Sequence, residues 1–478
     1  MKNKKMFQII AAAAFVTTAL STGTANAAAT KEPVKSAESK ATATKFNVTT
    51  EQVLINGEST SVSMLQTGNV KLIGAGDLAK YFGATVTTSN GVITIKSEKS
   101  GHSLQLEAGS NTFKLDGEAH PFTTAPVMQD NHLYVELNPM VAALGGEILN
   151  VGQTSQILKK ERVTGSFASV RFDTGGQVIA VKDDEETTKL FRLNTDYSSF
   201  LLSSDNNVSN MVISPSGDSA AYTDETGQLY LIGVRIGQPY KLGSDTSIKT
   251  DLVWSADGKK IYFVQGDKQE KISYISVGTG KITEIVADKV ENKSEVRVSA
   301  DGKKIAYIVN ITGIADSDKN SSEESLKIDY SKAGEQIYTF DLGVKDAKPA
   351  VVTTSNDNKL YPAFLSDGSV AYLSADSNNE NAKGAIKAIG ADGKTQDLIG
   401  DVDVTLSASS NGNVVAAGIT ADGNNKVYSI VAGVKTEIYS TKTDITDLAI
   451  SADGTKVAII ADGKVIVVQN GNTSEFTK

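Results

Sequence analysis

The sequence contains no cysteine, and only 3 histidines, 1 tryptophan and 8 prolines among its 478 residues. The lack of cysteine excludes disulfide bonds, thiol catalysis, zinc–thiolate sites and iron–sulfur clusters. Lysine and arginine number 47 against 56 aspartates and glutamates, a formal net charge of −9. This acidic balance argues against nucleic acid as a partner and against a polybasic membrane patch. The composition, 40% hydrophobic and 22% charged, is otherwise that of globular domains.

Residues 1–27 have the pattern of a secretory signal peptide. Three lysines within the first five residues precede a mostly apolar stretch from Met6 to Leu20, and Ala25-Asn26-Ala27 offers a small–x–small cleavage pattern. No later stretch approaches the ~20 apolar residues that a transmembrane helix needs. We therefore predict a cleaved signal, a flexible linker over 28–45, and a secreted protein that associates with the cell wall in one interpretation. Secretion without cysteine suggests a Gram-positive source.

Residues 46–150 contain what we interpret as an internal duplication of a small α+β unit. Each half begins with an apolar–polar–glycine turn of the kind that closes β-hairpins. A strand, a short helix that ends in glycine, and a second strand follow in each half. Asp77 is expected to cap the first helix at its N-terminus. The matching segments are Ile55-Asn56-Gly57 and Leu115-Asp116-Gly117 for the turns, and residues 70–87 and 133–149 for the strand–helix–strand series.

This duplicated pattern resembles the copper amine oxidase N-terminal domain, also called the stalk domain. In exported Gram-positive proteins the resemblance implies an accessory domain joined to unrelated partners, here a docking module. Copper catalysis in the oxidase family needs a tyrosine-derived quinone and three histidine ligands, one pair of them as His-x-His. His102, His120 and His132 contain no such pair. We therefore reject copper amine oxidase chemistry and predict no cofactor.

A second pattern, a Ser-x-Asp-Gly turn between two apolar strands, recurs from about residue 160 onward. A third strand with an aromatic or aliphatic residue and an outer fourth strand follow each turn. The turn glycines recur at intervals of 41 to 44 residues, apart from one interval of 66. A period of about 40–45 residues with four strands is the signature of a propeller blade. The turn glycines are Gly176, Gly217, Gly258, Gly302, Gly368, Gly412 and Gly454.

We therefore predict a mainly β protein in which a seven-bladed β-propeller over 160–478 follows the small duplicated α+β domain. The count falls to six if the repeat at Asp173 or the last repeat is irregular. Ring closure uses either residues 472–477 or a strand borrowed from residues 161–169. The repeated turn resembles the TolB-like, or WD40-like, propeller repeat. That resemblance implies binding of proteins or peptides, or gating of a serine peptidase domain.

Aromatic residues recur at matching places of the repeat, among them Tyr222, Phe263, Tyr307 and Tyr372. Each blade buries its apolar faces on its neighbours, so packing between blades is favoured over a role as sugar-stacking platforms. Trp254, the only tryptophan, falls on an innermost strand and receives the same interpretation.

The interval of 66 residues leaves an insertion that we place near residues 311–333. Asp316, Asp318 and Asn320 begin like a calcium-binding loop and are the metal candidate of this sequence. Ser321 stands where such a loop has glycine, and Lys327 where it has a bidentate glutamate. A solvated acidic loop is the alternative interpretation.

The sequence offers little for catalysis. A nucleophilic serine needs a base, usually histidine, and all three histidines lie in the small domain. No G-x-S-x-G elbow occurs. We therefore assign no catalytic and no cofactor-binding residue, and expect no enzyme.

Three hypotheses about function remain. The first is an exported, non-catalytic binding or scaffold protein of the cell envelope, whose propeller presents a surface to a protein, a peptide or a wall polymer. The second is a carbohydrate-active hydrolase or lyase built on the propeller, which a central-channel cluster of acids with aromatics would favour. The third is a structural envelope component whose small domain mediates assembly.

Overall fold

The computed structural model describes residues 46–478 with short gaps. The predicted signal peptide and linker lie outside the described residues. The gaps are 152–153, 174, 184–186, 205–210, 234–237, 317–326, 330–332 and 377–381. No helix in the part of the chain that the structure describes is long and apolar enough to span a membrane.

Residues 47–158 form two β-sheets and two short helices. The helices are α1 (Ala75–Tyr81) and α2 (Leu137–Ala143). The strands are β1 (Asn47–Ile55), β2 (Glu58–Thr67), β3 (Val70–Gly74), β4 (Ala84–Ser89), β5 (Val92–Ser97), β6 (Ser103–Glu107), β7 (Thr112–Leu115), β8 (Glu118–Pro121), β9 (Val127–Gln129), β10 (His132–Glu136), β11 (Glu147–Val151) and β12 (Thr154–Leu158). The seven-stranded sheet has the order β11-β12-β1-β2-β3-β10-β9, and the five-stranded sheet runs from β4 to β8 in chain order.

The predicted hairpin turns and helix ends are confirmed in this small domain. Asn56 and Asp116 have φ angles of 49° and 51°, and each is followed by a glycine with positive φ, as a two-residue hairpin turn requires. Gly83 and Gly145, just after the two helices, have φ angles of 66° and 80°. Both helices bury apolar side chains in one core, which includes Leu78, Phe82, Met140, Val141 and Leu144.

The prediction that Asp77 caps α1 is wrong. The residue before the helix is Gly74, which makes no side-chain cap, and Asp77 lies in the first turn. Its Oδ2 instead accepts a hydrogen bond of 2.7 Å from the backbone N–H of Ser63 on β2. The Asp77 carboxylate therefore bonds to the backbone of β2 and not, as the local sequence pattern predicts, to the N–H groups at the start of α1.

Seven antiparallel four-stranded sheets follow in the described residues between Phe167 and Glu475. The first three are β13 (Phe167–Phe172), β14 (Val178–Asp183), β15 (Thr188–Leu193) and β16 (Ser199–Ser203); β17 (Val212–Ile213), β18 (Ser219–Thr223), β19 (Leu229–Gly233) and β20 (Pro239–Lys241); and β21 (Lys249–Trp254), β22 (Lys260–Gln265), β23 (Lys271–Ser276) and β24 (Ile282–Val286).

The fourth sheet contains an insertion between its second and third strands. It consists of β25 (Lys293–Val298), β26 (Lys304–Ile311), β29 (Gly334–Asp341) and β30 (Ala350–Val351), and the separate hairpin β27 (Ile314–Asp316) and β28 (Lys327–Asp329) lies between β26 and β29. Ile311 on β26 pairs directly with Gly334 on β29, so the fourth sheet is continuous across the insertion. The insertion predicted near residues 311–333 therefore lies at this point.

The last three sheets again use consecutive strands. They are β31 (Asn358–Phe364), β32 (Val370–Ala375), β33 (Ala385–Ile389) and β34 (Thr395–Ile399); β35 (Asp403–Ser410), β36 (Asn413–Ile419), β37 (Asn425–Val431) and β38 (Val434–Thr441); and β39 (Ile445–Ile450), β40 (Lys456–Ala461), β41 (Lys464–Gln469) and β42 (Asn472–Glu475).

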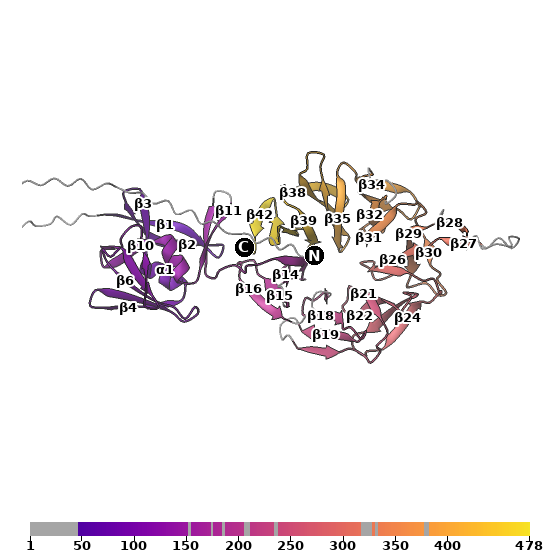
Figure 1. The fold of residues 1–478 in the computed structure, drawn as a ribbon, viewed down its shortest axis with the longest axis horizontal. Helices are drawn as coiled ribbons and strands as arrows, with labels where there is room; N and C mark the ends of the chain where they lie inside the picture. The colour runs from indigo at the N-terminus through magenta and orange to yellow at the C-terminus, as the bar shows by residue number, and fades with distance from the viewer. Residues whose placement is uncertain are drawn as a thin grey trace, which may run out of the picture. The chain divides into compact units, whose positions relative to one another are not determined.

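These sheets form a closed ring, as a β-propeller does. Figure 1 shows them following one another around a circle, with β21, β31, β35 and β39 toward its centre. Apolar clusters join neighbouring sheets: one contains Ile179 of the first sheet and Tyr222 of the second. The ring closes where Val170 on β13 packs in one cluster with Ile460 on β40. Each sheet is thus buried on two neighbours.

The Ser-x-Asp-Gly turns close the first hairpin of the third, fourth and seventh sheets with a repeated network. In the fourth sheet the Ser299 hydroxyl donates to Asp301 Oδ1 at 2.7 Å, and Oδ1 accepts the backbone N–H of Lys303 at 3.0 Å. Lys304 N–H donates to Ser299 Oγ at 2.9 Å, and Gly302 has a φ of 69°. The same bonds recur in the third and seventh sheets. The predicted hairpin role of this motif is confirmed.

The recurring aromatics of the propeller are packing residues, as the sequence indicates. Tyr222, Phe263, Tyr307 and Tyr372 are all nearly or fully buried. Tyr307 stacks on Tyr338 of the next strand with the ring centroids 5.7 Å apart. These rings are therefore not available as platforms for a ligand.

The seventh sheet takes its fourth strand from the C-terminal residues. β42 pairs with β41 from Gln469↔Asn472 to Ile466↔Glu475. Val163 and Gly165 also exchange hydrogen bonds with Lys478, at 3.0 and 3.3 Å. Of the two predicted closures, the structure therefore uses the one with residues 472–477 as the strand.

Candidate ligand-binding site

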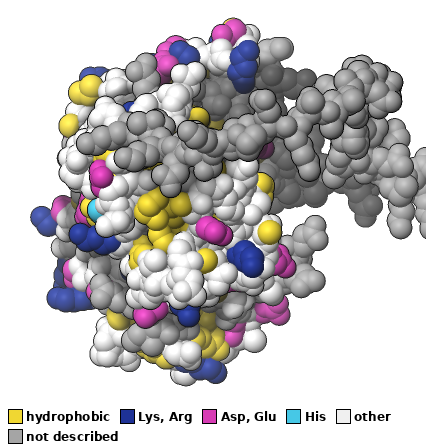
Figure 2. All heavy atoms as spheres, turned by 90° about the vertical axis from the view of Figure 1, so that its left-hand side faces the viewer, with side chains coloured by type: hydrophobic (Ala, Val, Ile, Leu, Met, Phe, Trp, Pro, Cys, Tyr) yellow, Lys and Arg dark blue, Asp and Glu magenta, His cyan; other side chains and the backbone are white. Residues whose placement is uncertain are grey.

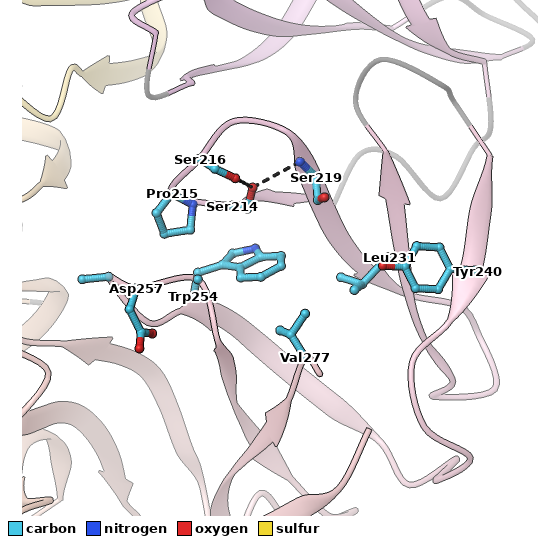
Figure 3. Close-up of a pocket in the computed structure, with 11 residues that line it drawn as sticks. Ser214, Pro215, Ser216, Ser219, Leu231, Tyr240, Trp254, Asp257 and Val277 are labelled. Carbon is cyan, nitrogen blue, oxygen red and sulfur yellow. Dashed lines mark hydrogen bonds between the residues drawn. The ribbon is translucent and has the colours of Figure 1, made fainter. Parts of the chain in front are cut away.

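A pocket of ≈ 370 Å³ lies between the second and third sheets of the propeller. Its walls are the turn that follows β17, the end of β21 with the turn that follows it, and side chains from β19 and β20. Figure 3 shows Trp254 in the middle, with Ser214 and Ser216 on one side and Val277 on the other. The lining residues are Ser214, Pro215, Ser216, Ser219, Leu231, Tyr240, Trp254, Ala256, Asp257, Gly258 and Val277.

Trp254 is held in one orientation. It is the last residue of β21, and its Nε1 donates a hydrogen bond of 2.9 Å to the carbonyl oxygen of Val212 on the neighbouring sheet. The indole also packs against the apolar cluster that contains Leu231 and Ile261. The side chain is half-buried, so part of it remains open to the pocket. The interpretation of Trp254 as a packing residue is therefore correct for one part of the ring only.

Tyr240 is the most exposed large side chain of the pocket. It lies on β20, a three-residue outer strand, and pairs in register with Leu231. Its exposed fraction is 57%. Because the ring has little protein around it, it is free to contact a ligand, and its removal should cost the fold little.

Hydroxyl groups form the polar wall of the pocket. Ser214 Oγ accepts the Ser219 N–H at 3.2 Å and lies 3.1 Å from Ser216 Oγ. Across the pocket, the Ser255 hydroxyl and the Lys259 N–H hold the pKa of the Asp257 carboxyl below its usual range. Asp257 is therefore ionised at neutral pH, and its carboxylate points away from Trp254 and the serines in Figure 3.

A second polar cluster occurs on the first strands of the sheets. The seventh residue before the turn glycine is Asp251, Glu295, Tyr361 and Asp447 in the third, fourth, fifth and seventh sheets. The first three have φ angles of 53°, 51° and 51°, and the ladder register shifts there, so each is part of a β-bulge. A left-handed Glu or Tyr costs conformational energy, and residues strained in this way are concentrated at functional sites.

The carboxylates of this cluster link one sheet to the next. Asp251 Oδ2 accepts the Glu295 N–H at 3.0 Å, and Asp447 Oδ2 accepts the Val170 N–H at 2.8 Å. Arg171 lies 2.9 Å from Asp447, and Arg297 lies 3.7 Å from Glu295. The bulges are therefore held by hydrogen bonds between sheets, which is a structural role for Asp251 and Asp447.

Burial and neighbouring charges shift the pKa values of Glu295 and Tyr361. Burial raises the pKa of Glu295, and the charges of Asp251 and Glu335 raise it further, against Arg297 and the Tyr361 N–H. Glu295 Oε2 is buried with no hydrogen-bond partner. Burial, then the charges of Glu295 and Asp447, raise the pKa of Tyr361. The Tyr361 hydroxyl thus lies within electrostatic reach of carboxylates on two other sheets.

The predicted metal residues gain no support from the structure. Asp318 and Asn320 lie outside the described residues, and Asp316 is described only as the last residue of β27. In the ranges that the structure describes, no group of three or more histidines and carboxylates could hold a metal ion. The calcium hypothesis stays untested.

The three histidines are separate from one another in their contacts. His102 Nδ1 lies 2.7 Å from Asp116 Oδ2, and His132 Nδ1 lies 2.8 Å from the Asp130 carbonyl oxygen. His120 stacks on Phe113 with the ring centroids 5.4 Å apart. These local partners account for the histidines without a metal.

Sequence reasoning missed both Tyr240 and the cluster of Asp251, Glu295, Tyr361 and Asp447. The cluster carries a signal, because its members stand at a constant distance before the turn glycine. Tyr240 carries none, since its place in the pocket depends on the packing of two sheets.

The family model of the copper amine oxidase N-terminal domain matches residues 54–159. The match covers the small domain from the end of β1 through β12. No protein with a curated description matches this sequence.

Solved structures share the propeller at low identity. A hydrazine synthase from Kuenenia stuttgartiensis is 13% identical, with 65% of this chain and 97% of that chain covered and a TM-score of 0.47. An oligogalacturonate lyase from Vibrio parahaemolyticus is 11% identical, with 68% and 96% covered and a TM-score of 0.46. A puromycin hydrolase is 14% identical, with 66% and 54% covered and a TM-score of 0.48. Likeness at this level carries no argument about function.

Proposed function

We propose that this chain is an exported, non-catalytic binding or scaffold protein of the cell envelope. The observation that carries the proposal is the pocket between the second and third sheets. It combines a fixed, half-buried Trp254, an exposed Tyr240 and a wall of serine hydroxyls, which is the lining of a recognition site rather than of a reaction centre. The partner is a wall polymer, a secreted protein or a peptide.

The ring in this proposal is a seven-bladed propeller of the TolB-like type. Two observations support seven blades over six. The repeat at Asp173 forms a regular turn, in which the Gly176 N–H donates to the Asp173 carbonyl at 3.0 Å. The last repeat has a complete set of four strands, from β39 to β42.

The small domain acts as the docking module in this proposal. Its surface leaves large hydrophobic side chains exposed, namely Val48, Val70, Val86 and Met128. Figure 2 shows hydrophobic side chains gathered into a patch on the face that it presents, with acidic and basic side chains around it. An exposed apolar patch is typical of a surface that binds a partner.

The proposal is tested with the mature chain, residues 28–478, and with residues 46–478, which lack the predicted linker. Both are incubated with purified cell wall and with secreted proteins, and the retained material is measured. Specific retention of both chains by one of these fractions is the expected result. If neither chain is retained by any fraction above an unrelated acidic protein, the binding function is wrong.

A hydrolase or lyase acting on carbohydrates is the second candidate function. It is favoured by one observation, the grouping of Glu295, Tyr361 and Asp447 on the first strands of three sheets. A carboxyl whose pKa is raised by burial is suited to act as a general acid. The test measures release of reducing ends, and of unsaturated products, from wall glycans and polyuronates. Turnover that Glu295→Gln abolishes, with the fold retained, would support this candidate over the first.

A further inference from the structure

We propose that the pocket between the second and third sheets binds an uncharged, hydroxyl-rich glycan, with Trp254 and Tyr240 as its ring contacts. This inference rests on the proposed binding function and gives it a ligand class. The pocket volume of ≈ 370 Å³ falls at the small end of the range of roughly 300–1,000 Å³ for ligand pockets, which corresponds to one or two sugar rings.

The lining contains both aromatic and hydroxyl groups, which match the two kinds of surface that a pyranose ring presents. A sugar has apolar C–H faces and a rim of hydroxyls that both donate and accept hydrogen bonds. Trp254 and Tyr240 are the aromatic lining residues for the first, while the Ser214 and Ser216 hydroxyls are the polar groups for the second. Trp254 is already held by its bond to Val212, so binding orders few side chains and loses little entropy.

A peptide is a poorer occupant because the backbone groups of the pocket walls are already bonded. The Ser214 N–H donates to the Ser219 carbonyl at 2.8 Å, and the Gly217 N–H to the Ser214 carbonyl at 2.9 Å. The Ser255 N–H and the Gly258 N–H are engaged in the same way in the facing turn. An extended peptide would bring its own N–H and C=O groups to walls with few backbone partners for them.

An anionic polymer is also disfavoured. The described lining contains no lysine, arginine or histidine, and its one charged group is the Asp257 carboxylate, whose pKa is lowered. The whole chain adds a net charge of −9. Lys259 lies 3.9 Å from the Asp257 carboxylate and offsets part of its charge, so the repulsion of polyuronates and phosphate-linked polymers comes mainly from the net charge of the chain. A neutral glycan would not meet this repulsion.

The test uses the mature chain and the fluorescence of Trp254, which reports on the pocket because the chain contains 1 tryptophan. The probe is chitotetraose, an uncharged oligomer of N-acetylglucosamine. We expect a saturable change in Trp254 emission as chitotetraose is added. A proline-rich peptide and a soluble polyuronate, titrated separately, are expected to give no saturable change.

Two matched variants locate the binding. Tyr240→Ala removes an aromatic ring that is 57% exposed, and Phe200→Ala removes one that is 56% exposed on β16, outside the pocket. Both retain Trp254 as the reporter, and neither ring contributes to the buried core. We expect Tyr240→Ala to weaken chitotetraose binding about 10-fold, which corresponds to 1.4 kcal/mol, and Phe200→Ala to leave it unchanged.

Three results would overturn the inference. They are the lack of a saturable response to chitotetraose, equal weakening in the two variants, and a saturable response to the peptide or the polyuronate in its place. If Trp254 does not respond while purified wall still retains the chain, the glycan inference fails and the proposed binding function stands. If Trp254 does not respond and no wall or secreted-protein fraction retains the chain, both the glycan inference and the proposed binding function are wrong.

Discussion

The third, fourth and fifth sheets of the propeller are held to their neighbours differently from the last two. In the first group the ninth residue before the turn glycine is a lysine with almost no exposed surface: Lys249, Lys293 and Lys359. Each ammonium donates to carbonyl oxygens of the loop that precedes its strand and pairs with an aspartate there. In the sixth and seventh sheets the same place holds Asp403 and Ile445.

The comparison teaches that one repeat can be held by a buried lysine and its loop partners, here called a polar clamp, by a carboxylate, or by apolar packing. In the sixth sheet Asp403 accepts the Gly384 N–H beside β33 at 2.8 Å. Ile445 packs among the apolar side chains between the sixth and seventh sheets, in a cluster with Leu448 and Ile459. Apolar packing is not directional, whereas an ammonium that donates to several carbonyls fixes the path of its loop. The left-handed residues Asp251, Glu295 and Tyr361 follow the clamped lysines by two positions, but Thr405 and Asp447 are not left-handed. The strained bulges therefore occur where the loops are clamped.

The largest effect is expected from removing a clamp. Lys293→Met keeps the length of the side chain but leaves the carbonyls of Glu270 and Val290 and the Asp288 carboxylate without their donor. We expect a loss of about 3–5 kcal/mol, measured by urea unfolding followed through Trp254. Lys259→Met, at a side chain that is 80% exposed, is the control and should change stability by less than ~0.5 kcal/mol. Equal losses would mean that the clamp contributes nothing of its own.

The seventh sheet receives a polar clamp from outside the repeat, and removing it should have the next largest effect. Arg162, with 8% of its side chain exposed, pairs with Glu147 at 2.8 Å and donates to the carbonyls of Glu475 and Thr477. We expect Arg162→Met to cost about 2–3 kcal/mol and to speed amide exchange on β42. When Glu147→Gln is added to Arg162→Met, the further loss of unfolding free energy should be smaller than the loss caused by Glu147→Gln alone, because both changes break one network. Strict additivity would contradict the network.

Glu295→Gln tests the clamped region through its pH dependence. The folded pKa of Glu295 is raised by burial, so the charged form destabilises the native state above that pKa, and the cost disappears as the pH falls through it. The variant should therefore be more stable than the unchanged protein at pH 7–8, by less than the losses expected for Lys293→Met and Arg162→Met. In acid the two proteins should be equally stable. Thermal unfolding against pH measures this, with the exposed Glu291→Gln as the control. A variant that is less stable at pH 8 would contradict the direction.

The smallest effect is expected at a feature that both groups of sheets share. The Ser451 hydroxyl, then the Thr455 N–H, lower the pKa of Asp453, so its contribution to stability is present above the unfolded value and is lost as the pH falls below 3.8. Asp453→Asn should lower the midpoint of thermal unfolding by about 1 °C at neutral pH, since the group is exposed. Asp257→Asn in the third sheet should behave alike. A clear difference between the two variants in the unfolding midpoint would mean that the turns of the third and seventh sheets also differ.

The repeat itself was predictable from the sequence. Each turn of the repeat needs one residue with positive φ at its end, and the glycines carry this signal at a regular spacing. The insertion near residues 311–333 follows from the one irregular interval. The cap at Asp77 was not predictable, because Ser63 competes for its carboxylate from a strand that is local in space and not in sequence.

The candidate sites could not be predicted in the same way. A lysine or glutamate on a strand normally indicates the solvated face, but the bulge at Glu295 adds a residue and shifts the alternation of the strand. The buried lysines find partners in loops whose positions are set by neighbouring sheets. The pocket depends on how the second and third sheets meet, because Tyr240 and Trp254 come from different repeats, and the spacing within one repeat does not encode this.

The direct pairing of Ile311 with Gly334 has a practical consequence for engineering. The two ends of the inserted segment are held one strand apart by the ladder of the fourth sheet, whatever the segment contains. A foreign domain with closely spaced termini could replace residues 312–333 and would impose little strain on the ring. A fluorescent protein placed there would make the propeller traceable by microscopy, far along the chain from the pocket at Trp254.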